Sequence, residues 1–165
     1  MDKAETKDKI LRLLQRNARL TEKELADRLQ TTPEEVSALI RKMQEDRTIM
    51  GYYALVNEDK LENAGVRAII EVEVQPQREG GYDRVAFMIS KFPEVKTVQL
   101  VSGRYDLRLE VVGASLQEVG LFVASKLAPI NGVKATVTHF LLKNYKEAGF
   151  RFYEDEYYER LKVAP

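Results

Sequence analysis

The residues best suited to binding chemistry in this chain are five polar side chains close together in the first third of the sequence. They are Thr31, Thr32, Ser37, Arg41 and Lys42. Hydroxyl groups and cations are the groups with which proteins bind phosphate oxygens, and the same groups can read base edges. The set therefore predicts contact with double-stranded DNA, provided that local structure presents these side chains together.

Two helix start signals position this set. Thr21 and Glu24 form one S/T-x-x-E capping box, and Thr32 and Glu35 form a second, with Pro33 at the first helical position. Apolar residues recur at helical spacing after each signal, so each helix has one face that can pack. Only a four-residue break is expected between the two helices, which is the spacing of a helix-turn-helix.

The elements on either side complete a three-helix head. Residues 6–16 predict a first helix with one apolar face, which can cover the other two. Residues 49–56 are rich in β-branched and aromatic side chains and predict a strand or short wing. We assign the head to residues 1–52 and a polar linker to residues 53–65.

From residue 66 onward, strand patterns alternate with helix patterns. The predicted strands are 66–74, 96–102, 106–113 and 133–143, and the predicted helices are 82–92 and 115–127. The order β-α-β-β-α-β is that of the ferredoxin-like fold, an antiparallel sheet with both helices on one face. The fold class is therefore α+β: a winged helix-turn-helix head followed by an αβ-sandwich domain over residues 66–143.

One face of this predicted sheet lies open to water. It is expected to carry Arg67, Glu71, Glu73, Gln99, Arg108, Glu110, Thr136 and Thr138. Such a face can form cross-strand ion pairs against a second sheet, which favours self-association. The tail, residues 144–165, is aromatic and acidic. It is expected to fold back onto the body or a neighbouring subunit, or alternatively to dock another protein.

The amino-acid composition excludes several kinds of active site. With no cysteine, the chain has no disulfide, thiol nucleophile or cysteine metal site, and neither a P-loop nor a dinucleotide motif is present. Its one histidine, His139, alternates with apolar Val137 and Leu141, which predicts a partly buried core residue rather than a ligand. We therefore predict no enzyme, cofactor or metal.

Charge and hydropathy bear on partners and compartment. The 26 basic and 26 acidic residues cancel, which argues against tight DNA binding by a monomer and favours a multimer. No apolar run of membrane-spanning length and no leader peptide is evident, which favours a cytoplasmic protein without a membrane partner.

Four short motifs carry a resemblance to a known family. They are K-I-L-R-L-L-Q at 9–15, I-x-G-Y at 49–52, G-x-Y-D at 103–106 and G-V-x-x-T-x-T at 132–138. In their order and spacing, the chain resembles the Lrp/AsnC (leucine-responsive, or feast/famine) family of transcription regulators over residues 6–143. The resemblance implies a dimer built by pairing two sheets, assembly into tetramers or octamers, and a small effector, typically an amino acid, bound between subunits.

The resemblance also implies where the effector binds. A free amino acid needs donors for its carboxylate and acceptors for its ammonium group. Backbone N–H groups at Gly103 and the carboxylate of Asp106 fit these roles, and Tyr105 would supply an apolar wall. Hydroxyls would come from Thr136 and Thr138. The alternative for residues 103–106 is a plain hairpin turn.

Two other functions stay open at this point. The positions at which relatives more typically place polar or basic residues hold Glu34, Glu35, Ala38 and Leu39. Acid at the leading edge of the helix repels phosphate, which favours a sensor that acts through protein contacts. Both glutamates would also stabilise the helix dipole. An enzyme resembling sirohaem decarboxylases is a further alternative, but such enzymes depend on histidine clusters, and a single histidine argues against it.

Overall fold

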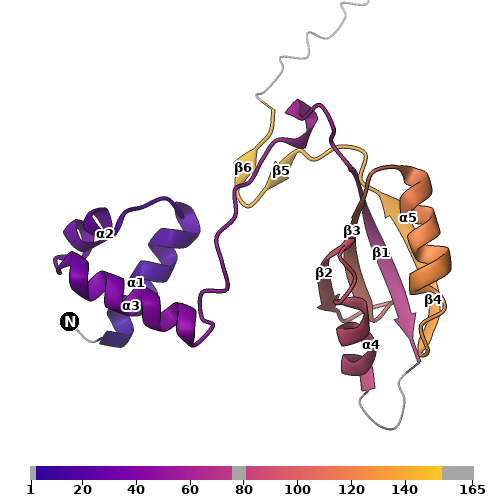
Figure 1. The fold of residues 1–165 in the computed structure, drawn as a ribbon, viewed down its shortest axis with the longest axis horizontal. Coiled ribbons are helices and arrows are strands. Elements are labelled where there is room, and N and C mark those ends of the chain that lie inside the picture. Colours follow the sequence, from indigo (N-terminus) through magenta and orange to yellow (C-terminus); the bar gives the residue numbers. More distant parts are fainter. Residues whose placement is uncertain (1–2, 76–80, 154–165) are drawn as a thin grey trace, which may run out of the picture. The chain divides into compact units, whose positions relative to one another are not determined.

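The computed structural model describes residues 3–75 and 81–153. The chain divides into two compact units, residues 1–56 and 57–165, which we describe separately (Figure 1). The division falls within the segment assigned to the linker, 53–65. In the described ranges, no helix is both long and apolar enough to cross a membrane.

The first unit is a bundle of three helices. They are α1 (Lys3–Arg16), α2 (Glu22–Leu29) and α3 (Pro33–Glu45). The predicted apolar faces meet at its centre, where Ile10, Leu25 and Val36 are fully buried. The helix-turn-helix prediction is confirmed, although three residues rather than four separate α2 from α3.

The two helix starts differ in how they are capped. At α2 the predicted capping box is complete: the Thr21 N–H donates to Glu24 Oε2 (2.8 Å) and the Glu24 N–H donates to Thr21 Oγ1 (3.2 Å). The backbone N–H and the hydroxyl of Thr21 lower the pKa of Glu24. At α3 only half of the predicted box forms. The Glu35 N–H donates to Thr32 Oγ1 (3.3 Å), but the Glu35 carboxylate accepts from the Thr31 hydroxyl instead of the Thr32 backbone.

The turn between α2 and α3 contains a strained residue. Gln30 caps α2 with φ 54° and ψ 48°, the left-handed region that glycine occupies at little steric cost. We expect Gln30→Gly to stabilise the first unit by about 0.5–1 kcal/mol. The matched change Gln15→Gly, near the end of α1, should give no gain. Thermal denaturation measures both, and equal effects of the two changes would contradict this account.

The predicted strand over residues 49–56 is wrong. Within the described part of the chain this segment pairs with no strand, and Met50 and Tyr53 are each 77% exposed. β-branched and aromatic residues favour a strand only when a neighbouring strand satisfies their backbone groups. A single turn of 3-10 helix, Glu58–Lys60, follows in the polar linker.

The second unit contains a four-stranded antiparallel sheet in the order β2-β3-β1-β4, which confirms the ferredoxin-like prediction. Its elements are β1 (Val66–Val74), α4 (Gly81–Ile89), β2 (Val95–Leu100), β3 (Leu107–Gly113), α5 (Leu116–Phe122), a π-helical turn (Val123–Leu127) and β4 (Val133–Phe140). Figure 1 shows α4 and α5 on one side of the sheet. The core lies between these layers and is centred on buried Ile70 and Leu109.

The second helix of this unit departs from the expected single helix over 115–127. Ser115 caps its start as predicted, with the Glu118 N–H donating to Ser115 Oγ (3.2 Å). After Phe122 the helix widens into the π-turn. The Ser125 hydroxyl donates to the Leu121 carbonyl oxygen (2.5 Å), and bonds of this kind compete with the helical ladder.

The register of β4 overturns two predictions about which face its side chains occupy. Thr136 lies opposite Val72 and Thr138 opposite Ile70, and both β1 partners are buried under the helices. Opposed residues of an antiparallel pair share a face, so the two threonines lie on the helix-covered face and not on the open one. A bulge between Glu73 and Val74 shifts the pairing, and a one-residue shift exchanges the two faces.

The same register places His139 on the face opposite to the one predicted from the sequence. It lies opposite Ile69 on the open face, its side chain is 55% exposed, and its Nε2 is 3.4 Å from Glu71 Oε1. The prediction of a partly buried core histidine is therefore wrong. The other six polar residues assigned to the open face do lie there. Those of β1 and β3 alternate with buried residues, and Gln99 of β2 lies opposite Arg108.

One arginine of the open face joins three separate segments. Arg67 contacts Glu58 (2.6 Å), Glu110 (3.2 Å) and Glu147 (3.2 Å), which belong to the linker turn, β3 and the C-terminal segment. Burial lowers the pKa of Arg67, but hydrogen bonding to Glu58 and the surrounding carboxylates outweigh it and raise that pKa overall.

The described part of the C-terminal segment forms a short hairpin of β5 (Lys146–Glu147) and β6 (Phe150–Arg151). The Tyr153 hydroxyl donates to Asp59, and this bond raises the pKa of Tyr153. Within one chain Tyr145 and Phe150 stay 67% and 62% exposed, whereas Phe152 and Tyr153 are half-buried, so this part of the tail covers only some of its rings on the body. The rest of the predicted tail, 154–165, lies outside the described residues.

Candidate nucleic-acid interface and effector site

The outer side of α3 presents the predicted DNA-contacting cations. Val36 and Met43 are buried against the other helices, so the side chains about half a turn away point outward. Arg41 and Lys42 are both exposed, and Ser37 is half-buried at the edge of this side. The structure thus presents these three side chains on one helix, as the sequence argument required.

The two threonines before α3 are less free than expected. The Thr31 N–H donates to the Ala26 carbonyl oxygen (3.1 Å), and its hydroxyl donates to Glu35. A phosphate that bound Thr31 would have to displace the Glu35 carboxylate. Thr32 is exposed, and its hydroxyl accepts the N–H of Glu35.

Four of the five predicted effector residues lie toward the sheet end where β1 stops, and Thr138 is the exception. The loop over 101–106 joins β2 to β3, and its Gly103 is exposed with φ +142°. Asp106 closes the loop: its N–H donates to the Val72 carbonyl oxygen (3.1 Å), and its Oδ2 accepts the Val74 N–H (2.7 Å). This carboxylate therefore holds the end of β1 in place.

The remaining predicted residues lie at different distances from Asp106. Tyr105 is half-buried beside it in the same loop. Thr136 lies on the far side of Val72, two strand spacings or about 10 Å from β3. Thr138 lies two residues further along β4, opposite Ile70. The structure thus places Tyr105 and Thr136 near the sheet end, and Thr138 lies further from it.

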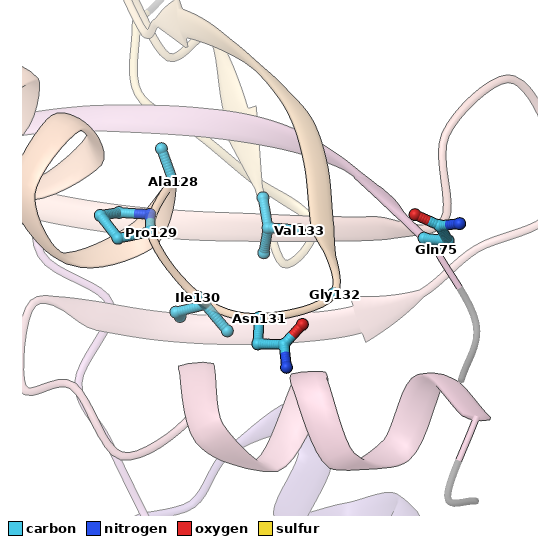
Figure 2. A pocket seen from close by; sticks show the side chains of 7 residues that line it. All are labelled: Gln75, Ala128, Pro129, Ile130, Asn131, Gly132 and Val133. Atoms are coloured by element: carbon cyan, nitrogen blue, oxygen red, sulfur yellow. The ribbon is translucent and has the colours of Figure 1, made fainter. Parts of the chain in front are cut away.

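A pocket of about 500 Å³ opens at the same end of the sheet. It is lined by Gln75, Ala128, Pro129, Ile130, Asn131, Gly132 and Val133. Figure 2 shows six of these residues along the loop that enters β4, with Gln75 contributed by the chain just after β1. The Gln75 N–H donates to the Gly132 carbonyl oxygen (2.8 Å), which links the pocket to the strand end held by Asp106.

None of these lining residues is among the binding residues predicted from the sequence, although Gly132 belongs to the G-V-x-x-T-x-T motif at 132–138. Gly132 has φ +101°, and a Cβ there would lie 2.9 Å from Val85 Cγ2, so the turn needs glycine. That close approach depends on how α4 packs, and local sequence carries no signal for it.

Two substitutions test whether Asp106 holds the end of β1 by accepting the Val74 N–H. Asp106→Ala leaves the buried Val74 N–H without its acceptor, and we expect it to lower the free energy of unfolding of the second unit by about 1–3 kcal/mol. Asp106→Asn keeps an acceptor oxygen and should lose less than half of that. Urea denaturation followed by tyrosine fluorescence reports on this unit, because six of the eight tyrosines follow residue 57. Equal losses for the two variants would refute the strand-holding role.

Comparison with known proteins agrees with this geometry. Residues 67–149 match the family model described as Lrp/AsnC ligand binding domain, and residues 4–50 match winged helix-turn-helix DNA-binding. The chain belongs to the Lrp/AsnC family. It is 36% identical over 166 residues to an uncharacterized HTH-type transcriptional regulator, YugG, of Bacillus subtilis (strain 168), and the match covers 100% of both chains. The family and these relatives are transcription regulators and not enzymes.

Further Lrp/AsnC relatives extend the comparison. The leucine-responsive regulatory protein of Haemophilus influenzae is 26% identical over 86% of this chain and 85% of its own length. Among solved structures, a Neisseria meningitidis transcriptional regulator in complex with L-Met is 29% identical, with a TM-score of 0.66, over 89% of this chain and 93% of that one. Mycobacterium tuberculosis AldR, at 22% identity and a TM-score of 0.74, shares the fold over 88% of this chain and 97% of its own. This chain is thus a DNA-binding transcription regulator with a ligand-binding domain.

Proposed function

We propose that this regulator changes its DNA affinity when an amino acid or related metabolite binds at the sheet end that carries Asp106 and the pocket. The observation that carries the proposal is the meeting of three features there: the exposed Gly103 turn, the Asp106 carboxylate and the pocket entered from Gln75. The L-Met complex of the Neisseria relative supports an amino acid as the class of effector.

The groups at this sheet end suit the two charged ends of an amino acid. One carboxylate oxygen of Asp106 accepts the Val74 N–H, and the other can accept a hydrogen bond from an ammonium group. Backbone N–H groups in the glycine turn can donate to a carboxylate. Tyr105 would line the side chain of the effector, and Thr136 would add a hydroxyl from β4. Thr138 would contribute only if the effector reached further along that strand.

On the DNA side, we propose that Arg41 and Lys42 bind phosphate and that Ser37 contacts the groove. Thr32 would bind phosphate at the start of α3, and Thr31 would join it only on release of Glu35. Head residues 1–52 would then form the DNA-binding domain. The 11 Lys and Arg of a single head are nearly cancelled by 10 Asp and Glu, which makes binding by several heads together the effective mode.

We propose that two copies pair through the open sheet face, and that such dimers assemble into tetramers or octamers. The face carries both signs of charge, with Arg108 and Glu71 opposite each other, and exposed apolar residues such as Val137, which is 50% exposed. This mixture suits a self-complementary interface. We place the assembled regulator in the cytoplasm, where its DNA would be.

Regulation then follows from linkage. An effector bound where subunits meet would favour one arrangement of neighbouring dimers, and that arrangement would decide which half-sites their α3 helices occupy together. Because coupling is reciprocal, DNA carrying the preferred half-site spacing should raise the affinity for the effector.

The test is retention of a labelled fragment from upstream of the protein's own coding sequence, at two salt concentrations, with and without a mixture of the twenty amino acids. We expect retention that exceeds random DNA, weakens with salt and changes when amino acids are added. Light scattering in parallel should show a dimer or larger. Specific retention that no amino acid alters would refute the effector, and no specific retention would favour the sensor alternative.

A further inference from the structure

One acidic residue on the outward side of α3, Glu34, has no hydrogen-bond or ion-pair partner among the described residues. Glu34 is exposed, and it makes no hydrogen bond or ion pair with any residue that the structure describes. Its neighbour Glu35 is different, because its carboxylate is held by the Thr31 hydroxyl. Both carboxylates lie in the first turn of α3 and suit its dipole, but that of Glu34 faces outward without a hydrogen-bond partner among the described residues.

The position of Glu34 is the one from which a helix-turn-helix reads bases. Residues near the N-terminus of the second helix contact base edges in the major groove. Glu34 is the second residue of α3, which begins at Pro33. Ala38 lies four residues later on the same side of the helix and is also exposed. Because its side chain is only a methyl group, the helix can approach the groove floor closely beside Glu34.

An ionised carboxylate only accepts hydrogen bonds, and this restricts what Glu34 can bind on DNA. Phosphate oxygens also only accept and are negatively charged, so they repel it. In the major groove, cytosine offers the N4 amino donor, whereas adenine places the N7 acceptor beside its N6 donor. We propose that Glu34 reads a cytosine in each half-site. This rests on the proposed DNA contact through α3, and it makes Glu34 a residue for specificity and not for affinity.

The test is selection from a random duplex library with the full-length protein at fixed moderate salt, followed by sequencing of the bound DNA. We expect the wild-type protein to enrich a C·G pair at one position of each half-site, by about tenfold over the other pairs. Glu34→Ala should reduce that preference to background and leave the rest of the motif. Glu34→Gln should move the preference to A·T, because glutamine pairs with adenine N6 and N7.

Glu45→Gln is the matched control. Glu45 is exposed near the other end of α3, and its substitution removes the same charge, so it should raise retention of random DNA without altering the C·G preference. Circular dichroism checks that all variants fold. A wild-type motif that Glu34→Ala leaves intact would overturn the cytosine assignment alone. A wild-type protein that enriches no sequence would overturn both this assignment and the DNA contact through α3.

Discussion

Replacing Arg41 and Lys42 with alanine is expected to lower DNA affinity on the order of 100-fold at fixed salt. Both side chains are exposed on the outer side of α3, where only they carry positive charge close to the proposed groove contacts. If each binds one phosphate in both copies of a dimer, four contacts are lost. The slope of log affinity against log salt should then fall in magnitude by about 3.6, because each contact contributes about 0.9.

The control for this pair is Arg84→Ala with Lys91→Ala, which removes one exposed cation in α4 and one just after it, both in the second unit. The net charge changes equally, so a general electrostatic effect would weaken binding in both double variants. We expect the control to keep the wild-type salt slope. Fluorescence anisotropy at four salt concentrations measures both quantities, and a slope unchanged by the α3 substitutions would refute phosphate binding there.

Local sequence signals were sufficient to predict the helix-turn-helix and the strand order. The capping box at Thr21 and the N-cap at Thr32 depend on residues within one helical turn, and the buried alternation of β1 needs only its own period. Such features are set by neighbouring residues and elementary geometry. A short stretch of sequence is therefore enough to reveal them.

The errors in strand pairing, side-chain face and pocket lining all involve contacts between distant segments. The faces of Thr136 and His139 depend on the bulge in the β1–β4 pairing, and nothing within residues 133–143 encodes it. The unpaired segment 49–56 lacks a partner strand that no local pattern could reveal. Likewise, the pocket requires Gln75 to meet a loop more than fifty residues later. The prediction of the candidate site was therefore limited by strand register and tertiary contacts, and less by the chemistry of its residues.

Arg67→Met is expected to lower the free energy of unfolding of the second unit by about 2 kcal/mol. The change keeps much of the apolar volume but leaves Glu58, Glu110 and Glu147 without their shared cation. Breaking a fully buried ion pair costs about 3–5 kcal/mol, and the lower figure allows for the 20% exposure of the Arg67 side chain. The hairpin should also lose its anchor, and hydrogen exchange at residues 146–151 should rise.

Salt separates electrostatics from packing in this variant. Three carboxylates without a cation repel one another, and salt screens this repulsion as well as the ion pairs of the wild-type protein. The loss of stability in Arg67→Met should therefore shrink as the salt concentration rises. Arg108→Met is the matched control, because on the same face its Nη1 donates, among the described residues, only to neutral Gln99 (3.1 Å), and it should cost less than about 0.5 kcal/mol. Urea denaturation at low and high salt measures both variants, and a loss for Arg67→Met that stays constant with salt would show that Arg67 contributes through packing and not through its charge.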